Sequence, residues 1–251
     1  MIFHVMTLFP ELVTACAESS ILGRAKEKAL VDVRPWNIRD YSKDKHRHVD
    51  DYPYGGGAGM LMKAEPVYDC YRAITDGMEK KPRVIFMTPA GKRFDQEDAK
   101  RYALEEELVI LCGHYEGIDE RVLEMIVTDE VSIGDFVVTG GELPALLIMD
   151  AVSRFVPGVL GKLASAEEDS FSSGLLEYPQ YTRPVVYEGM EVPEILRNGN
   201  HQLIARWRRK EALKATYLLR PDLLPAEPDK QDAKLLKEIK EELSQDDSAC
   251  Q

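Results

Sequence analysis

The sequence of 251 residues lacks the features that mark several common classes of protein. No apolar run approaches the ~20 residues that a membrane-spanning helix needs. The N-terminus shows neither a basic leader nor a small-residue cleavage site. The four cysteines have no CxxC spacing and no pairing with nearby histidines, so they predict no metal site. We therefore expect a cytoplasmic protein with reduced thiols.

The usual nucleotide-binding fingerprints are also missing. The segment GGGAG, Gly55 to Gly59, fails the G-x-G-x-x-G pattern because Met60 follows it, and no G-x-x-x-x-G-K-[ST] segment occurs. These absences argue against a classical dinucleotide site and against a Walker-type site. For the surrounding segment DYPYGGGAGM, composition alone favours a flexible surface loop as much as a functional loop.

Positive charge is scarce overall, because 32 Lys and Arg face 44 Asp and Glu, for a net charge of −12. This balance argues against nonspecific nucleic-acid binding, which depends on contacts from Lys and Arg to phosphates. The distribution is nevertheless uneven. Residues 201–220 contain six Lys or Arg and one Glu, whereas residues 226–251 contain eight acidic residues and four lysines. A basic segment is thus followed by an acidic tail.

Short apolar runs alternate with helical patterns along the first two thirds of the chain, and 44% hydrophobic residues suffice for a core. Two of the runs, KPRVIFMTP and EELVILCG, end at Pro or Gly, as strands commonly do. Strands that alternate with helices predict an α/β fold with a mostly parallel sheet. We predict strands at 2–8, 30–36, 81–89 and 106–113, helices at 10–22, 95–106 and 143–155, and a further element at 121–136.

The pattern changes after Gly161. We assign residues 1–160 to the α/β domain. Residues 161–180 carry Ser, Gly, Glu and Pro without periodicity and are predicted to form a flexible interdomain linker. Helical apolar spacing from Val192 onward places a small α-helical domain at 181–251, which ends in the acidic tail.

Three clusters of glycine and proline directly follow strand-like runs: MTPAG at 87–91, CGHYEG at 112–117 and GDFVVTGGELP at 134–144. Turn chemistry explains any one of them. In open α/β sheets, however, the carboxyl ends of the strands meet in one crevice, so together the clusters favour a ligand site. Backbone N–H and C=O groups with little side-chain bulk suit an adenine edge and a ribose, and the last turn has no lysine for phosphates.

The predicted helix 143–155 is apolar around almost its whole circumference, and its polar residues Asp150, Ser153 and Arg154 fall in an arc of about 100°. We expect a buried helix with one polar stripe. An ordinary ion pair between Asp150 and Arg154 is one interpretation. Because a buried cation needs a partner, a substrate or a second subunit, we favour a functional role for Arg154.

Two charged segments have ordinary explanations as well as functional ones. The acids of AEEDSF, 166–171, are typical of a solvated cluster. RWRRK, 206–210, interleaves Trp207 with cations, which suits phosphate contact and base stacking, but an amphipathic helix surface has the same pattern.

Seven segments together resemble the bacterial tRNA (guanine-N1)-methyltransferase family, TrmD. The match runs in order from the first strand to about Leu224, and only the acidic tail lies outside it. The segments are DYPYGGGAGM, GHYEGIDERV, SIGDFVVTGGELPAL, DAVSRFVPGVLG, LLEYPQYTRP, VPEILRNGNH and WRRKEAL.

The resemblance implies a SPOUT-class fold, in which the C-terminal part of the α/β domain passes through a loop and forms a trefoil knot, a rare arrangement. It also implies S-adenosylmethionine as the methyl donor, bound by the loops of the knot. Carried over to this sequence, the implied cofactor-binding residues are Pro89, Gly113, Tyr115, Glu116, Ile133, Gly134, Asp135, Phe136, Val137, Val138, Gly140, Gly141 and Pro144.

The resemblance implies the reaction as well. The product is 1-methylguanosine at the guanosine immediately 3′ of the anticodon, when another guanosine precedes it. Guanine N1 bears a hydrogen and is a poor nucleophile until that proton leaves, so the reaction needs a base. The base of the family maps onto Asp169, and the arginine that stabilises charge on guanine O6 maps onto Arg154.

The implied partners are tRNA and a second copy of the chain, in a homodimer with active sites at the subunit interface. Magnesium dependence is a trait of the family, although no ligand cluster in the sequence argues for a bound ion. Two departures, His114 in place of an arginine and NGNH in place of SGNH, concern fine tRNA contacts. The expected tRNA-binding residues are Arg183, His201, Arg206, Trp207, Arg208 and Arg209.

Two other functions stay open at this point. A SPOUT methyltransferase acting on the ribose 2′-OH would use an arginine-led site and would not require the carboxylate of Asp169. A noncatalytic RNA-binding protein would use the region around RWRRK, while the glycine clusters served only as turns.

Overall fold

The computed structural model describes residues 1–161 and 170–249, with side chains through residue 245. The chain divides into two compact units, Met1–Leu163 and Ala164–Gln251. Each unit has a hydrophobic core of its own and is described by itself.

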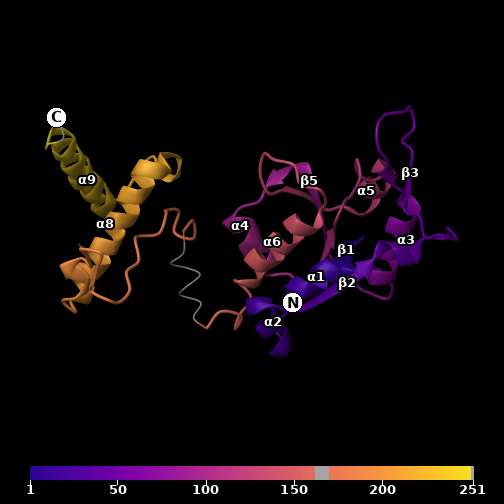
Figure 1. Cartoon of the computed structure of the whole chain (residues 1–251), viewed down its shortest axis with the longest axis horizontal. Coiled ribbons are helices and arrows are strands. Elements are labelled where there is room, and N and C mark those ends of the chain that lie inside the picture. Colours follow the sequence, from indigo (N-terminus) through magenta and orange to yellow (C-terminus); the bar gives the residue numbers. More distant parts are fainter. Residues whose placement is uncertain (162–169, 250–251) are drawn as a thin grey trace. The chain divides into compact units, whose positions relative to one another are not determined.

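A five-stranded sheet forms the centre of the first unit (Figure 1). The strand order is β2-β1-β6-β5-β7, and all four neighbouring pairs are parallel. The prediction of a mostly parallel α/β sheet is therefore confirmed. The strands are β1 (Ile2–Thr7), β2 (Asp32–Asn37), β5 (Arg83–Arg93), β6 (Glu107–Leu111) and β7 (Asp129–Ser132).

Helices cover both faces of this sheet, as a parallel sheet with nearly continuous apolar strands requires. Alternate strand residues enter different cores: Ile85 joins the core under α1, α2, α4 and α6, whereas Val84 joins the core under α3 and α5 (Figure 1). The helices are α1 (Pro10–Ala17), α2 (Ser20–Glu27), α3 (Ala64–Thr75), α4 (Gln96–Tyr102), α5 (Glu120–Ile126) and α6 (Glu142–Ser153), with a 3₁₀ turn at Ile38–Tyr41.

The predicted helix 10–22 is wrong in one respect, because two helices replace it. α1 ends where the N–H of Glu18 donates to the carbonyl of Thr14 and the N–H of Ser19 donates to the carbonyl of Cys16, and Ser20 then takes a φ of +52°. The apolar spacing continues through the break, so periodicity alone does not reveal it. α3 and the short hairpin β3 (Asp50–Asp51) with β4 (Leu61–Met62), which carries the GGGAG loop, were not predicted.

The strand predicted to end at Pro89 continues to Arg93 instead. Met87 and Lys92 both pair with Val131, so the four residues between them bulge away from β7. Proline is tolerated at a bulge because no ladder hydrogen bond is needed there. Gly91, the last of these four residues, already lies close to β7 again, since a Cβ on it would lie 2.4 Å from the backbone nitrogen of Val131.

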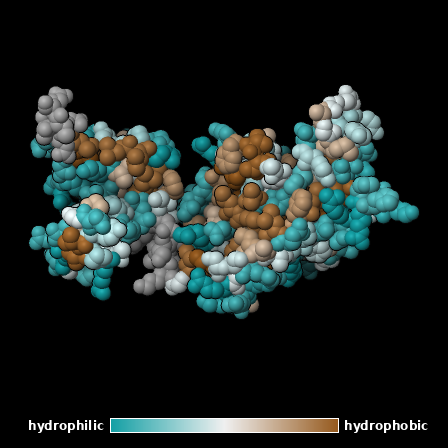
Figure 2. Space-filling view, viewed as in Figure 1, coloured by the Kyte–Doolittle hydropathy of each residue, from teal (hydrophilic) through white to brown (hydrophobic). Residues whose placement is uncertain are grey.

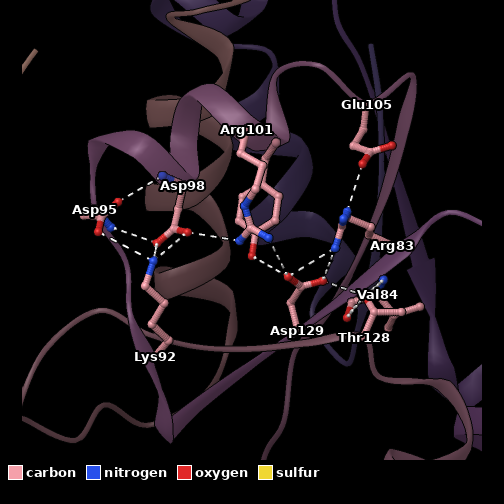
Figure 3. Close-up of polar contacts among 10 residues, drawn as sticks. Arg83, Val84, Lys92, Asp95, Asp98, Arg101, Glu105, Thr128 and Asp129 are labelled. Carbon is pink, nitrogen blue, oxygen red and sulfur yellow. Dashed lines mark hydrogen bonds and ion pairs between the residues drawn. The ribbon is translucent and has the colours of Figure 1, made fainter.

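An ion-pair network holds β5, α4 and β7 together below this bulge (Figure 3). Arg83 bonds the carboxylate of Asp129 at 3.1 Å, and Arg101 contacts both Asp129 and Asp98. Burial of the Asp129 carboxyl acts to raise its pKa, but hydrogen bonds from Thr128 and Arg83 outweigh the burial, so the pKa lies below the usual aspartate value.

The second unit is built on two helices, α8 (His201–Leu219) and α9 (Lys230–Ala249). Asn200 caps α8 by accepting hydrogen bonds from the N–H groups of Gln202 and Leu203. A short hairpin, β8 (Val186–Tyr187) with β9 (Met190–Glu191), and 3₁₀ turns at Glu194–Leu196 and Pro221–Leu223 complete the unit. Its small core contains Leu175, Ala212, Leu213, Leu235 and Ile239.

The described part of the predicted linker, residues 170–180, packs onto this second unit. Leu175 is only 3% exposed, and the N–H of Leu176 donates to the hydroxyl of Thr216 on α8 at 2.9 Å. The rest of the predicted linker, from Lys162 to Asp169, lies outside the described residues.

Candidate cofactor site

A cavity of about 310 Å³ lies beside the bulge of β5, where the chain leaves β6 and β7. The three glycine and proline clusters identified in the sequence all contribute to its wall, as expected for loops at the carboxyl ends of parallel strands. Of the predicted cofactor-binding residues, Asp135 is not part of the lining. The others line it: Pro89, Gly113, Tyr115, Glu116, Ile133, Gly134, Phe136, Val137, Val138, Gly140, Gly141 and Pro144.

Two glycines in this wall leave no room for a side chain. A Cβ on Gly141 would lie 2.6 Å from the Cα of Cys112, and the N–H of Gly141 donates to the carbonyl of Gly113 at 2.9 Å. A Cβ on Gly140 would collide with the imidazole of His114. The turn before α6 is therefore pressed directly against the backbone that follows β6.

The rim of the cavity is apolar and partly exposed. Phe136 is 56% exposed and Val137 is 84% exposed, although both are hydrophobic. Glu116 supplies a carboxylate to the lining and also packs over Gly59, where a Cβ would lie 2.4 Å from Cγ of Glu116. The N–H of Glu116 donates to the carbonyl of Met60 at 3.0 Å, so the GGGAG loop is tied to the cavity wall.

Sequence reasoning missed a buried carboxylate beneath the cavity. Glu142, 2% exposed in the first turn of α6, accepts a hydrogen bond from the Thr7 hydroxyl at 2.6 Å. Its other oxygen lies 2.5 Å from Nε2 of His114, whose ring contacts Phe9 with 5.0 Å between centroids. Burial, together with the charge of Glu142, raises the pKa of the neighbouring Cys112 thiol. The sequence offered one sign of this residue, because a carboxylate in the first turn of a helix is stabilised by the helix dipole.

The prediction of a buried helix with one polar stripe, formed by Asp150, Ser153 and Arg154, is wrong in part. Leu143 and Leu147 are 55% and 49% exposed and share a face with the exposed Asp150, whereas Ser153 points into the core at 1% exposed. When nearly every position is apolar, periodicity cannot tell which side packs on the sheet. Arg154 lies half-buried at the end of α6 and is not part of the cavity lining. Asp169 lies outside the described residues.

The expected tRNA-binding residues all lie in the second unit. Arg183 and His201 are exposed. Arg206 and Arg209 form ion pairs with Glu238 and Asp232 of α9. Trp207 and Arg208 instead contact the rings of Tyr181 and Tyr178.

Among the residues that the structure describes, no group of three His, Cys, Asp or Glu side chains is arranged to hold a metal ion. Within the same residues, no helix combines the length and the apolar character needed to cross a membrane.

Comparison with known proteins gives a consistent result. The family described as tRNA (Guanine-1)-methyltransferase TrmD matches residues 1–226. Proteins named tRNA (guanine-N(1)-)-methyltransferase are similar over most of the chain. The one from Lachnospira eligens is 59% identical over 221 residues, 88% of this chain and 94% of the relative. Those from Ruminiclostridium cellulolyticum and Bacillus cereus are 55% and 54% identical over 228 and 239 residues, covering 91% and 95% of this chain and 98% of each relative.

A parallel α/β unit with a glycine-lined cavity at the strand ends, matched along its whole length by such relatives, defines the class as tRNA methyltransferases. Within this class, the chain belongs to the TrmD family of tRNA (guanine-1)-methyltransferases.

Proposed function

We propose that the chain catalyses S-adenosylmethionine-dependent methylation of N1 of the tRNA guanosine immediately 3′ of the anticodon, when a guanosine precedes it. One observation carries the proposal. Two of the segments that the chain shares with the family, GHYEGIDERV and SIGDFVVTGGELPAL, come together with the bulge of β5 around one cavity of the first unit. Family membership supports the reaction, and the cavity supports the place of the methyl donor.

The residues around the cavity fit this cofactor. Its wall offers backbone groups and apolar side chains, which suit the flat, weakly polar adenosine of the donor. Gly140 and Gly141 allow the backbone to form this wall where any side chain would collide. Glu116 adds a carboxylate, a favourable neighbour for a sulfonium cation. When bound, S-adenosylmethionine supplies an electrophilic methyl group.

The chemistry of the acceptor explains the proposed roles of two side chains. The N1 proton of guanine has to leave for N1 to form a bond to carbon, and the carboxylate of Asp169 accepts it. Negative charge then grows on guanine O6, and the guanidinium of Arg154 stabilises that charge by donating a hydrogen bond. Because guanine in a base stack hides N1, the target nucleotide has to be turned out of the stack first.

Two features of the first unit support a SPOUT knot and a homodimer as parts of this proposal. The segment around Gly141 is packed backbone to backbone against Cys112 and Gly113, as two threaded segments would be. The exposed side chains of Leu143 and Leu147, with Val137 at the cavity rim, leave apolar surface suited to a second copy. A hydrophobic patch lies in the middle of this unit (Figure 2). The second unit then serves to bind tRNA.

The direct test is incubation with labelled S-adenosylmethionine and unmodified tRNA that carries or lacks the guanosine pair, followed by nucleoside analysis. We expect 1-methylguanosine only with the pair present. Turnover is measured with and without Mg²⁺, since the resemblance implies Mg²⁺ dependence. The variant Asp169→Asn should keep its affinity for S-adenosylmethionine and lose methylation. A 2′-O-methylated product, or undiminished methylation by Asp169→Asn, would overturn the mechanism, and the absence of saturable heat with S-adenosylmethionine would favour a noncatalytic RNA-binding protein.

A further inference from the structure

The cations of α8 divide into two sets with different surroundings. Successive residues of a helix are turned by about 100°, so Arg206 and Arg208 lie on opposite sides of Trp207. The side of Arg206 faces α9, and the side of Arg208 faces the segment that contains Tyr178. The sequence alone places all of these residues in one basic stretch.

On the α9 side, carboxylates of the same unit already pair with the cations. Arg209 meets Asp232 with two hydrogen bonds, Nε to Oδ1 at 2.9 Å and Nη2 to Oδ2 at 2.5 Å, and Asp232 is 4% exposed. These hydrogen bonds raise the pKa of Arg209. Arg206 contacts both oxygens of Glu238 at 2.8 Å, and Lys210 bonds Glu242.

A phosphate approaching this side would have to displace a carboxylate from each cation. It would also meet the negative charge of α9, since Asp232, Glu238 and Glu242 all project toward α8. Ion pairs of this kind clamp α9 against α8 over the small core that contains Leu213 and Ile239. The α9 side therefore has the character of a structural contact.

The opposite side carries aromatic rings with a cation above one of them. The rings of Tyr181 and Trp207 lie 6.3 Å apart between centroids and are tilted by 52°. The guanidinium of Arg208 lies 4.9 Å from the centroid of Tyr178. Tyr181 is 49% exposed and Arg208 is exposed. Among the residues that the structure describes, no carboxylate forms an ion pair with Arg208.

We propose that Tyr178, Tyr181, Trp207 and Arg208 form the surface of the second unit that contacts RNA, by stacking on unpaired bases and by a phosphate contact from Arg208. The half-exposed ring of Tyr181 and the partly buried rings of Trp207 and Tyr178 lie next to a guanidinium with no carboxylate partner among the described residues. Aromatic rings beside a cation are the groups with which proteins bind single-stranded RNA. Arg206 and Arg209 hold α9 in place and do not contact RNA. The inference rests on the proposed function for the identity of the partner as tRNA.

The test is the affinity of full-length protein for unmodified tRNA, measured by fluorescence anisotropy with labelled tRNA. Trp207→Leu should raise the Kd by about tenfold, in line with the loss of one stacked base. Arg208→Gln should weaken binding and lower the slope of log Kd against log salt by about one, as the loss of one phosphate contact predicts.

The matched control is Arg206→Gln. Arg206 is a cation on the same helix, but it pairs with the carboxylate of Glu238 on α9. It should leave the Kd within about twofold of wild type, while lowering the urea midpoint of the second unit. Each variant should keep its affinity for S-adenosylmethionine, which shows that the first unit is intact. Equal weakening by Arg206→Gln and Arg208→Gln, or unchanged binding by Trp207→Leu and Arg208→Gln, would overturn this inference alone. Failure of the wild-type protein to bind tRNA would overturn the proposed function and this inference together.

Discussion

At Gly141 the turn before α6 passes so close to β6 that a Cβ would lie 2.6 Å from the Cα of Cys112. Backbone atoms cannot move aside as a flexible side chain can. The residue has an ordinary φ of −76°, so glycine is needed here because a Cβ would collide with the backbone at Cys112, and not because of the backbone conformation. The cavity wall thus depends on a residue with no side chain.

Gly141→Ala should lower the free energy of unfolding by about 1–3 kcal/mol, the usual cost of forcing extra volume into a packed site. It should also weaken binding of S-adenosylmethionine, measured by calorimetry, because the turn must shift. Gly161→Ala is the matched control, since a Cβ there meets nothing within 4 Å. Equal behaviour of the two variants would contradict the described geometry.

The buried carboxylate of Glu142 has two polar partners, the hydroxyl of Thr7 and the ring of His114. Glu142→Ala should destabilise the first unit by about 1–3 kcal/mol, because the buried hydroxyl of Thr7 and the partly buried ring of His114 each lose their hydrogen bond to the carboxylate. Urea unfolding followed by the fluorescence of Trp36 measures the effect in a Trp207→Phe background. The exposed Glu120 provides the control, Glu120→Ala, for which we expect a change within about 0.5 kcal/mol. A loss no larger than that of the control would contradict the network.

Asp129 makes stability depend on pH, because its pKa in the folded protein lies below the usual value. A carboxylate with a lowered pKa contributes its stability above the unfolded pKa of ~3.9 and loses it as the pH falls through the folded value. The difference in urea midpoint between wild type and Asp129→Asn should therefore be largest near neutral pH and shrink below about pH 4. A difference that grows on acidification would contradict the ion-pair network of Figure 3.

At the residue scale, the sequence predicted most of the cavity wall, because glycine and proline after apolar runs report turns at strand ends. It did not predict the contact of Glu142 with Thr7. These residues are 135 positions apart, and no local pattern encodes which strand end a helix start will meet. The choice of Asp169 came from the resemblance to the family alone. The pattern of the apolar helix already favoured a function for Arg154, and the resemblance supplied its role. Both roles remain predictions.

At the scale of elements, the alternation of strands and helices was sufficient to predict the parallel sheet, whereas the first and last residues of each strand and helix were less predictable. β5 runs past Pro89 because a bulge accommodates the proline. The hydrophobicity of α6 on all sides concealed its orientation, which the contacts with β1, α1 and α4 decide. Local patterns thus predict that an element exists more reliably than they predict which face it buries.

The helix α9 lies beyond the residues matched by the family, yet it supplies Leu235 and Ile239, two of the five buried residues in the core of the second unit. Ile239 is fully buried against α8. Ile239→Ala should cost ~2–5 kcal/mol of stability, as large-to-small substitutions in cores do. Trp207 reports on this unit alone in a Trp36→Phe background, so urea unfolding can be followed there. A loss below about 1 kcal/mol would show that α9 is not part of the core.

At the scale of the whole molecule, the exposed face of α6 provides the test of the proposed homodimer. Leu147 is 49% exposed, and a charge there would be buried without a partner in a dimer. Leu147→Glu should therefore convert the dimer to a monomer in light scattering and abolish turnover. Leu104→Glu is the matched control, since Leu104 is 86% exposed and lies outside α6 and the cavity wall. A dimeric Leu147→Glu would place the interface elsewhere.

The cavity beside the bulge of β5 and the ends of β6 and β7 is the proposed place of the methyl donor. The decisive measurement is a crystal structure of the protein grown with saturating S-adenosylmethionine. We expect density for the adenosine between Pro89, the backbone at Gly113 and the turn that ends at Gly141. Density for the ligand at any other place, or none in this cavity despite saturation, would contradict it.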